Sequence, residues 1–149
     1  MSTAVALLLS VHLLATAAMV GLIWFVQVVH YPLFAAVGAD RFVAYEVAHQ
    51  RLTSYVVGPP MAVEGLTALA LLVAAPDGVG RAWPLLGLAL LAVIHAGTVL
   101  LQVPAHGRLA QDGDPAVMRR LVSTNWIRTI GWSARGALAV AMLVGAATA

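Results

Sequence analysis

Ionisable side chains inside long apolar stretches are the groups of this chain best suited to do chemistry. Four of them lie within such stretches: Glu64, His95, Arg128 and Arg135. Placing a charged side chain at the centre of a membrane costs about 2.5–3.5 kcal/mol, so each one marks a functional site unless a partner neutralises it. We expect these four residues to be catalytic. Glu64 or His95 would act as the base, and an arginine would stabilise an oxyanion.

These groups lie at similar depths if the apolar stretches are helices. At a rise of about 1.5 Å per residue, Glu64 and His95 lie roughly 12 Å from one end of their helices, and Arg135 lies roughly 15 Å from that end. An unpaired carboxylate at this depth would be protonated or expelled, so we predict that Glu64 contacts Arg135, Arg128 or His95. In the simpler alternative, Glu64 and an arginine neutralise each other and only fix the packing of the helices.

Polar and aromatic residues gather towards the same end of the predicted helices, which we call side A. Asn125, Arg128, Trp132 and Arg135 follow one another at spacings of three, four and three, which places them on one helix face. We predict a pocket that opens to side A, with a floor formed by Glu64, His95 and Arg135 and a wall of tryptophans for a flat ring. The residues expected to bind substrate are Trp24, Gln27, His30, Gln102, His106, Asn125, Trp126 and Trp132.

The histidines are candidate ligands for a metal or a haem. His30, His95 and His106 together with Glu64 offer imidazole and carboxylate groups, which suit iron, copper or zinc. Each of these ligands comes from a different helix or turn. A haem held by two histidines is harder to build, because His30 and His106 lie near the membrane interface and His95 has no partner at its own depth. The cofactor stays open, while His12 is expected to be a hydrogen-bonded core residue.

The composition is typical of an integral membrane protein. Of the 149 residues, 62% are hydrophobic and 9% are charged, against about 45–50% and 25% in soluble domains. Residues 1–39 and 82–107 contain no Asp, Glu, Lys or Arg. The chain has no cysteine, which excludes disulfides and thiolate metal sites. All eight basic residues are dispersed arginines, a pattern that favours membrane-edge anchors over nucleic-acid binding.

Four segments are long enough to span a membrane, which takes about 20 apolar residues. We expect these helices at about residues 4–30, 55 or 59 to 75, 83–103 and 125–144, in a single domain that covers residues 1–149. The predicted fold class is all-α, a four-helix transmembrane bundle with up-down topology. Apolar residues at helical spacing between Phe42 and Val56 predict a short amphipathic segment on the membrane surface between the first two helices.

The distribution of arginines predicts the orientation of the bundle. Side A holds five arginines and the opposite side holds Arg81 alone. The five are Arg41, Arg51, Arg108, Arg119 and Arg120. The positive-inside rule then places side A in the cytoplasm and both termini on the non-cytoplasmic side. We expect a multi-pass protein of the cell membrane.

Short motifs at the helix ends carry a family resemblance. Val103-Pro104 ends the third predicted helix, Asn125-Trp126-Ile127-Arg128-Thr129 opens the fourth with Trp132 following, and His30-Tyr31-Pro32 closes the first. In these motifs the chain resembles the anthrone-oxygenase-like family of small four-helix membrane proteins. It departs from the family pattern at Ala105-His106-Gly107, where an Asn-rich stretch is expected. The resemblance implies oxidation or oxygenation of a hydrophobic, polycyclic, phenol-like substrate near Asn125 and Arg128.

Three functions remain open at this point. The first is a membrane-embedded oxidoreductase whose hydrophobic aromatic or lipid-like substrate enters from the bilayer. The second is an accessory subunit of a larger membrane complex that binds lipid, quinone or pigment. The third is a small proton-coupled carrier with Glu64 and His95 as its relay, although the chain has no inverted repeat. The expected partners are membrane lipids and a hydrophobic small molecule, with no nucleic acid. Assembly into a homo-oligomer or a larger membrane complex is compatible with the sequence.

Overall fold

Four long helical rods make up the protein, in a computed structural model that describes residues 2–76 and 78–149. The first rod contains α1 (Thr3–Phe25), a π-helical turn η1 (Val26–His30), α2 (Tyr31–Leu33) and a 3-10 turn η2 (Phe34–Ala36). The second rod is α3 (Ala39–Val73). The third contains α4 (Ala82–Gly97), a π-helical turn η3 (Thr98–Gln102) and α5 (Val103–Asp112), and the fourth is α6 (Pro115–Thr148). Each rod is long and apolar enough to cross a membrane, which confirms the predicted all-α fold.

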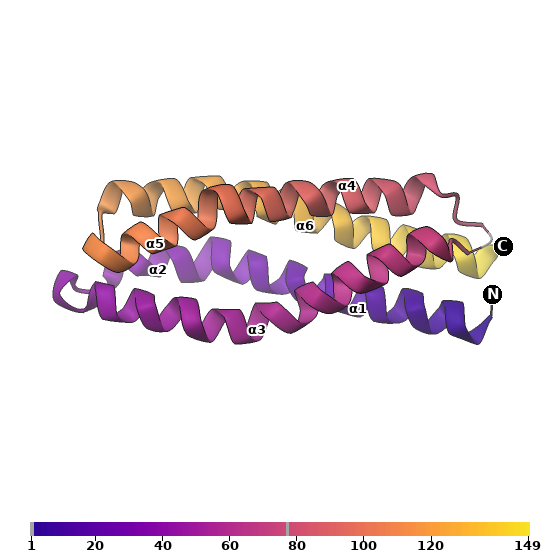
Figure 1. Cartoon of the computed structure of the whole chain (residues 1–149), viewed down its shortest axis with the longest axis horizontal. Coiled ribbons are helices and arrows are strands. Elements are labelled where there is room, and N and C mark those ends of the chain that lie inside the picture. The colour runs from indigo at the N-terminus through magenta and orange to yellow at the C-terminus, as the bar shows by residue number, and fades with distance from the viewer. Residues whose placement is uncertain (1, 77) are drawn as a thin grey trace.

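The rods run up and down, so that the two ends of the chain lie at the same end of the bundle (Figure 1). Helix α1 packs against α3 and α6, and α4 packs against the same two helices. The continuation of α4 in α5 also contacts α3 and α6. The rods therefore follow one another around the bundle in the order α1, α3, α4–α5 and α6.

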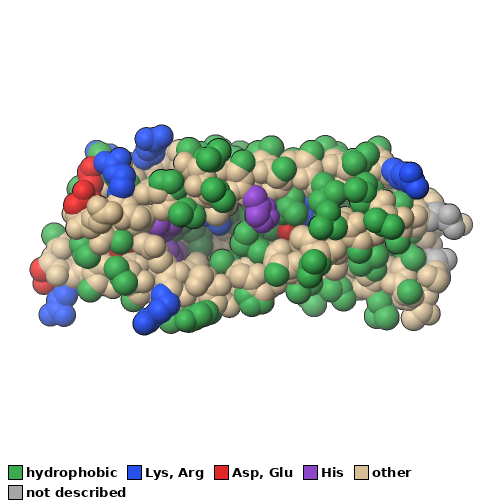
Figure 2. Space-filling view, viewed as in Figure 1, with side chains coloured by type: hydrophobic (Ala, Val, Ile, Leu, Met, Phe, Trp, Pro, Cys, Tyr) green, Lys and Arg blue, Asp and Glu red, His purple; other side chains and the backbone are tan. Residues whose placement is uncertain are grey.

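The outward face of the bundle is apolar over its middle. Leu14, Leu66, Leu100 and Ile130, one from each rod, are all more than half exposed. Figure 2 shows hydrophobic side chains along the middle of the molecule, whereas most of the charged side chains lie towards the end opposite the chain termini. Apolar side chains on this scale are stable on the outside only when lipid surrounds them, so this surface is that of a membrane protein.

The helices extend further on side A than the sequence predicts. Helix α3 is continuous over 35 residues, or about 52 Å, whereas the hydrocarbon core of a bilayer is about 30 Å thick. The predicted amphipathic segment between the first two helices is therefore the first part of α3, and it does not lie on the membrane surface as a separate helix. The third and fourth helices likewise run beyond their predicted limits, to Asp112 and from Pro115.

Proline positions explain two features of the rods. Pro59 and Pro60 lie inside α3 without ending it. The carbonyls that they leave unpaired belong to Tyr55 and Val56, which are exposed. Pro32 and Pro104 each follow a π-helical turn by two residues. A proline lacks the N–H that would bond to the carbonyl four residues earlier, and a wider turn just before it accommodates this loss.

The extended ends of the rods share a core of their own. Tyr31, Phe34, Phe42, Leu109 and Leu121 are buried together at side A. Gly113 adopts a φ of 65° between α5 and α6, where an added Cβ would lie 3.0 Å from the Phe42 ring, so a glycine fits both the conformation and the space. This core packs α3 against α5 and thereby positions the polar side chains that lie next to it on these two helices.

Candidate functional site

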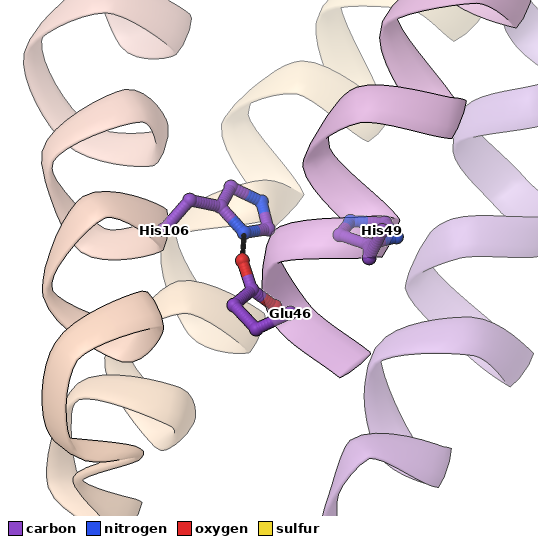
Figure 3. A group of neighbouring side chains, drawn as sticks. All are labelled: Glu46, His49 and His106. Atoms are coloured by element: carbon purple, nitrogen blue, oxygen red, sulfur yellow. Dashed lines mark hydrogen bonds and ion pairs between the residues drawn. The ribbon is translucent and has the colours of Figure 1, made fainter. Parts of the chain in front are cut away.

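Three residues of the types that bind metals form a cluster between α3 and α5. Glu46 and His49 come from α3, and His106 comes from α5 and faces them across the bundle (Figure 3). One ligand atom from each residue lies within 4.8 Å of the other two. The Nδ1 atom of His106 lies 2.6 Å from Oε1 of Glu46. Glu46 is fully buried and His49 is nearly so. We call these three residues the histidine–carboxylate cluster.

Residues around the cluster fix the orientation of both imidazole rings. Nδ1 of His49 lies 2.9 Å from Nε2 of His30 and 3.0 Å from the Thr53 hydroxyl. On the other ring, Nε2 of His106 lies 2.8 Å from the Tyr31 hydroxyl. Each imidazole therefore has one nitrogen engaged by a neighbour from another part of the fold, which is the usual arrangement around metal-binding histidines.

A cavity of about 240 Å³ adjoins the cluster. Most of its wall is apolar, and its polar side chains include His49 and His106 of the cluster together with Gln102 and Arg128. Such a mostly apolar space with a few polar groups is typical of small-molecule sites. The residues that line it are Met19, Leu22, Ile23, Val26, Tyr31, His49, Gln50, Thr53, Ser54, Val57, Thr98, Gln102, Val103, His106 and Arg128.

Three buried polar atoms in and beside this cavity have no hydrogen-bond partner among the described residues. They are Oε1 of Gln102, Nε of Arg128 and Oε2 of Glu46. Other polar atoms of the first two side chains are used within the fold, since Nε2 of Gln102 donates to Thr124 and Nη1 of Arg128 donates to Asn125. Leaving a buried polar group unpaired costs about 1–3 kcal/mol, so these atoms, like Oε2 of Glu64 and Nε1 of Trp132 elsewhere in the bundle, are candidates for a partner that the described residues do not supply.

The predicted ion pair of Glu64 is confirmed. Nε of Arg135 donates to Oε1 of Glu64 at 2.5 Å, and the Thr16 hydroxyl donates to the same oxygen at 3.0 Å. Arg135 also donates to the Gly87 carbonyl. Both charged side chains are almost completely buried. Eighteen residues separate Glu64 from Glu46 along α3, or about 27 Å, so this pair and the histidine–carboxylate cluster are separate polar centres.

The floor of the cavity differs from the prediction. Glu64, His95 and Arg135 do not line it. His95 instead bonds to the Leu91 carbonyl of its own helix at 2.9 Å. Apolar side chains such as Met19 and Ile23 line the cavity instead. Of the four residues predicted to be catalytic, only Arg128 borders this space.

Among the predicted substrate-binding residues, Gln102 and His106 line the cavity, whereas the other six are not part of its lining. Oε1 of Gln27 accepts a hydrogen bond from Asn125 at 2.9 Å, which ties the first rod to α6. His30 contacts His49 through a hydrogen bond between their ring nitrogens. The inward stripe of α6 is as predicted, because Asn125, Trp132 and Arg135 are buried.

The predicted tryptophan wall does not border the cavity. Trp24 and Trp126 contact each other edge to face, with their ring centroids 5.7 Å apart, and both are more than 40% exposed on the outside of the bundle. Trp132 is fully buried beside Arg135, whose guanidinium carbon lies 6.0 Å from the ring centroid. Helical spacing places residues on a shared face but does not show which of them reaches a cavity.

The metal site predicted from His30, His95, His106 and Glu64 is not assembled. Eleven residues separate His95 from His106, or about 16 Å along the rod, and Glu64 is paired with Arg135. Glu46 and His49 were not among the candidate ligands predicted from the sequence. Their Glu-x-x-His spacing was the available signal, because residues three apart share a helix face. His12 is a hydrogen-bonded core residue as predicted, with Nδ1 2.8 Å from the Thr67 hydroxyl.

No protein-family model matches the chain, and comparisons with curated proteins and with solved structures give no match either. The resemblance to the anthrone-oxygenase-like family therefore rests on its sequence motifs alone. The function is therefore inferred from the geometry of the cavity and its polar residues.

Proposed function

We propose that the protein binds a compact aromatic molecule with one polar end in the cavity beside Gln102 and Arg128, and acts on it as a membrane-embedded oxidoreductase. The observation that carries this proposal is a buried donor and a buried acceptor without a partner among the described residues, Nε of Arg128 and Oε1 of Gln102, on two side chains that line a mostly apolar cavity. A phenol satisfies both, because its oxygen accepts a hydrogen bond from the guanidinium and its hydroxyl donates one to the amide oxygen.

The size and position of the cavity restrict the class of ligand. At about 240 Å³ it lies just below the usual range of about 300–1,000 Å³ for drug-sized ligands, so it suits a compact ring system better than a two-chain lipid. The outer surface around it is apolar, with Val56 and Val103 both more than half exposed. A hydrophobic substrate dissolved in the bilayer therefore has a short path to the site.

The polar residues of the cavity support the first step of such an oxidation. Removal of the phenol proton leaves a negative charge on the ring oxygen, and Arg128 is the cation placed to stabilise it. The proton passes to the histidine–carboxylate cluster, whose imidazoles of His49 and His106 border the same space. The electron-rich phenolate is then oxidised to a quinone by molecular oxygen. One oxygen atom replaces the hydrogen on a ring carbon as a new C=O group, and the other oxygen atom is reduced to water. Oxidation of a phenol-like substrate is also what the motif resemblance implies.

Binding of a simple naphthol to the purified protein in detergent tests this proposal. Arg128→Gln removes the cation, and Val57→Phe fills the cavity without touching a polar group. Each is expected to weaken naphthol binding at least tenfold, as measured by quenching of tryptophan fluorescence. His95→Ala is the matched control, because His95 lies outside the cavity lining, and its affinity should stay within twofold of the wild type. Wild-type affinity in both cavity variants would refute the proposal.

A further inference from the structure

We propose that Glu46, His49 and His106 bind one divalent first-row transition-metal ion at the polar end of the cavity. The ligand atoms assigned to the ion are a carboxylate oxygen of Glu46, Nε2 of His49 and Nδ1 of His106. This inference does not depend on the identity of the cavity ligand, since it concerns a different set of side chains and a different kind of partner.

The burial of Glu46 is the first argument for a cation. Its side chain is fully buried, yet its hydrogen-bond partners are His106 and Gln50 rather than an arginine. Its second oxygen has no partner among the described residues. A buried carboxylate without a compensating charge is costly. Glu64 also has one oxygen without a partner among the described residues, but Arg135 supplies its counter-charge. A metal ion supplies a permanent positive charge at Glu46, which otherwise only a protonated His106 would provide, and it uses the free oxygen.

The surrounding hydrogen bonds are the second argument, because they leave one nitrogen of each ring for the ion. Nδ1 of His49 is engaged by His30 and Thr53, so Nε2 is free to coordinate. Nε2 of His106 is engaged by Tyr31, so Nδ1, which faces Glu46, is the ligand atom. Outer hydrogen bonds of this kind hold a histidine in the tautomer and orientation that a metal requires.

The distances need only a small adjustment to accommodate an ion. With bonds of about 2.0–2.2 Å, two ligand atoms on one ion lie about 3.3 Å apart in tetrahedral geometry and at most about 4.3 Å apart. All pairs of the cluster lie within 4.8 Å, so the widest pair must close by at most about half an ångström. The Glu46–His106 pair, at 2.6 Å, must open slightly as the ion displaces the proton that these two atoms share. Rotations of side chains are sufficient for both movements.

The ligand set indicates which metal ions the site suits and towards which space their open coordination positions would face. Two imidazoles and one carboxylate suit zinc and iron(II), and in both cases such three-ligand sites keep further positions open. His49 and His106 line the cavity, whereas Glu46 is not part of its lining. The open positions therefore face the cavity. With an ion bound, these histidines would no longer accept protons, and hydroxide on the ion would be the proton acceptor of the proposed function.

The position along α3 is compatible with loading from water. If the last 20 or so residues of α3 cross the hydrocarbon core, Glu46 and His49 lie roughly 8–12 Å beyond its edge. The His106 side chain is 13% exposed. An ion dissolved in water on side A reaches this level without crossing the apolar belt.

Titration of the chelator-treated protein with Co²⁺ in detergent, without naphthol, tests the site through the visible absorption bands of bound cobalt. We expect one ion per chain, and affinities at least a hundredfold weaker in Glu46→Gln and in His106→Asn. His30→Asn removes only an outer hydrogen bond, and we expect it to weaken binding by roughly tenfold. The matched control His95→Asn should bind as the wild type does. Equal affinity in the ligand variants, or an equal loss in His95→Asn, would overturn the site.

X-ray absorption of cobalt bound to the wild type keeps the inference falsifiable if a ligand variant does not fold. Two imidazoles in the first coordination shell are expected, and a shell of oxygen atoms alone would contradict the site. The result is separable from the proposed function. Failure of cobalt binding leaves the effects of Arg128→Gln and Val57→Phe on naphthol binding untouched, and failure of naphthol binding leaves the cobalt titration untouched.

Discussion

Replacing Glu64 by glutamine should destabilise the bundle strongly, because it leaves the charge of Arg135 without a counter-charge. The Arg135 side chain is 2% exposed, and its other partners are the Gly87 carbonyl and the face of Trp132. Removing one partner of a buried ion pair costs about 3–5 kcal/mol. Since 1.36 kcal/mol corresponds to a factor of ten, the ratio of folded to unfolded protein should fall by roughly 10²–10⁴.

The double variant Glu64→Gln with Arg135→Gln separates the charge from the packing. It removes both charges, so it should recover most of the loss and differ from the wild type by about 1–2 kcal/mol, the value of the lost hydrogen bonds to Thr16 and Gly87. Equilibrium unfolding in detergent with increasing dodecyl sulfate, followed by circular dichroism, gives both values. Asp40→Asn is the control, because the Asp40–Arg41 pair is exposed and such pairs contribute about 0–1 kcal/mol. The reasoning is refuted if Glu64→Gln costs less than about 1 kcal/mol, or if the two substitutions are additive.

Two further predictions concern packing and orientation. Gly131→Ala should cost about 1–3 kcal/mol in the same unfolding assay, because the new Cβ would lie 2.7 Å from the buried side chain of Ile94. Gly21→Ala, whose Cβ meets nothing within 4 Å, should instead be neutral or stabilising by up to about 1 kcal/mol. Reporter tags at the two chain ends should both lie on the non-cytoplasmic side, since the arginines of side A favour the cytoplasm; a cytoplasmic signal from either tag would contradict this orientation.

The number and order of the helices could be predicted from the sequence, because long apolar segments have few stable alternatives in a membrane. Their limits could not. The prediction ended the third helix at Val103, before Pro104, and began the fourth at Asn125, after the segment with Arg119 and Arg120. The polar segments remain helical beyond these points. The extended ends stabilise one another by burying Phe42, Leu109 and Leu121. This tertiary packing outweighs the local change in composition.

The polar centres could be predicted where the spacing within one helix, or the cost of one isolated charge, was sufficient. The inward stripe of α6 followed from helical spacing, and the pairing of Glu64 followed from the cost of an isolated charge in the membrane. The partners of His106 were not predictable in this way. Glu46 is sixty residues away in sequence, in a segment that was predicted to lie on the membrane surface. Whether a side chain reaches the cavity depends on rotamers and crossing geometry, which explains why His95 and the tryptophans were misplaced.

The ionisation state of a naphthol bound to the protein tests the central claim most directly. A phenol has an ordinary pKa of about 10, so binding as phenolate at pH 7 requires stabilisation of the anion by about 4 kcal/mol. Arg128 in a mostly apolar cavity is expected to supply most of it. The ultraviolet difference spectrum of the bound naphthol at pH 7 should show the phenolate band with the wild type and lose it with Arg128→Gln. A bound naphthol that keeps its neutral spectrum in the wild type, or a phenolate band that survives Arg128→Gln, would contradict the account.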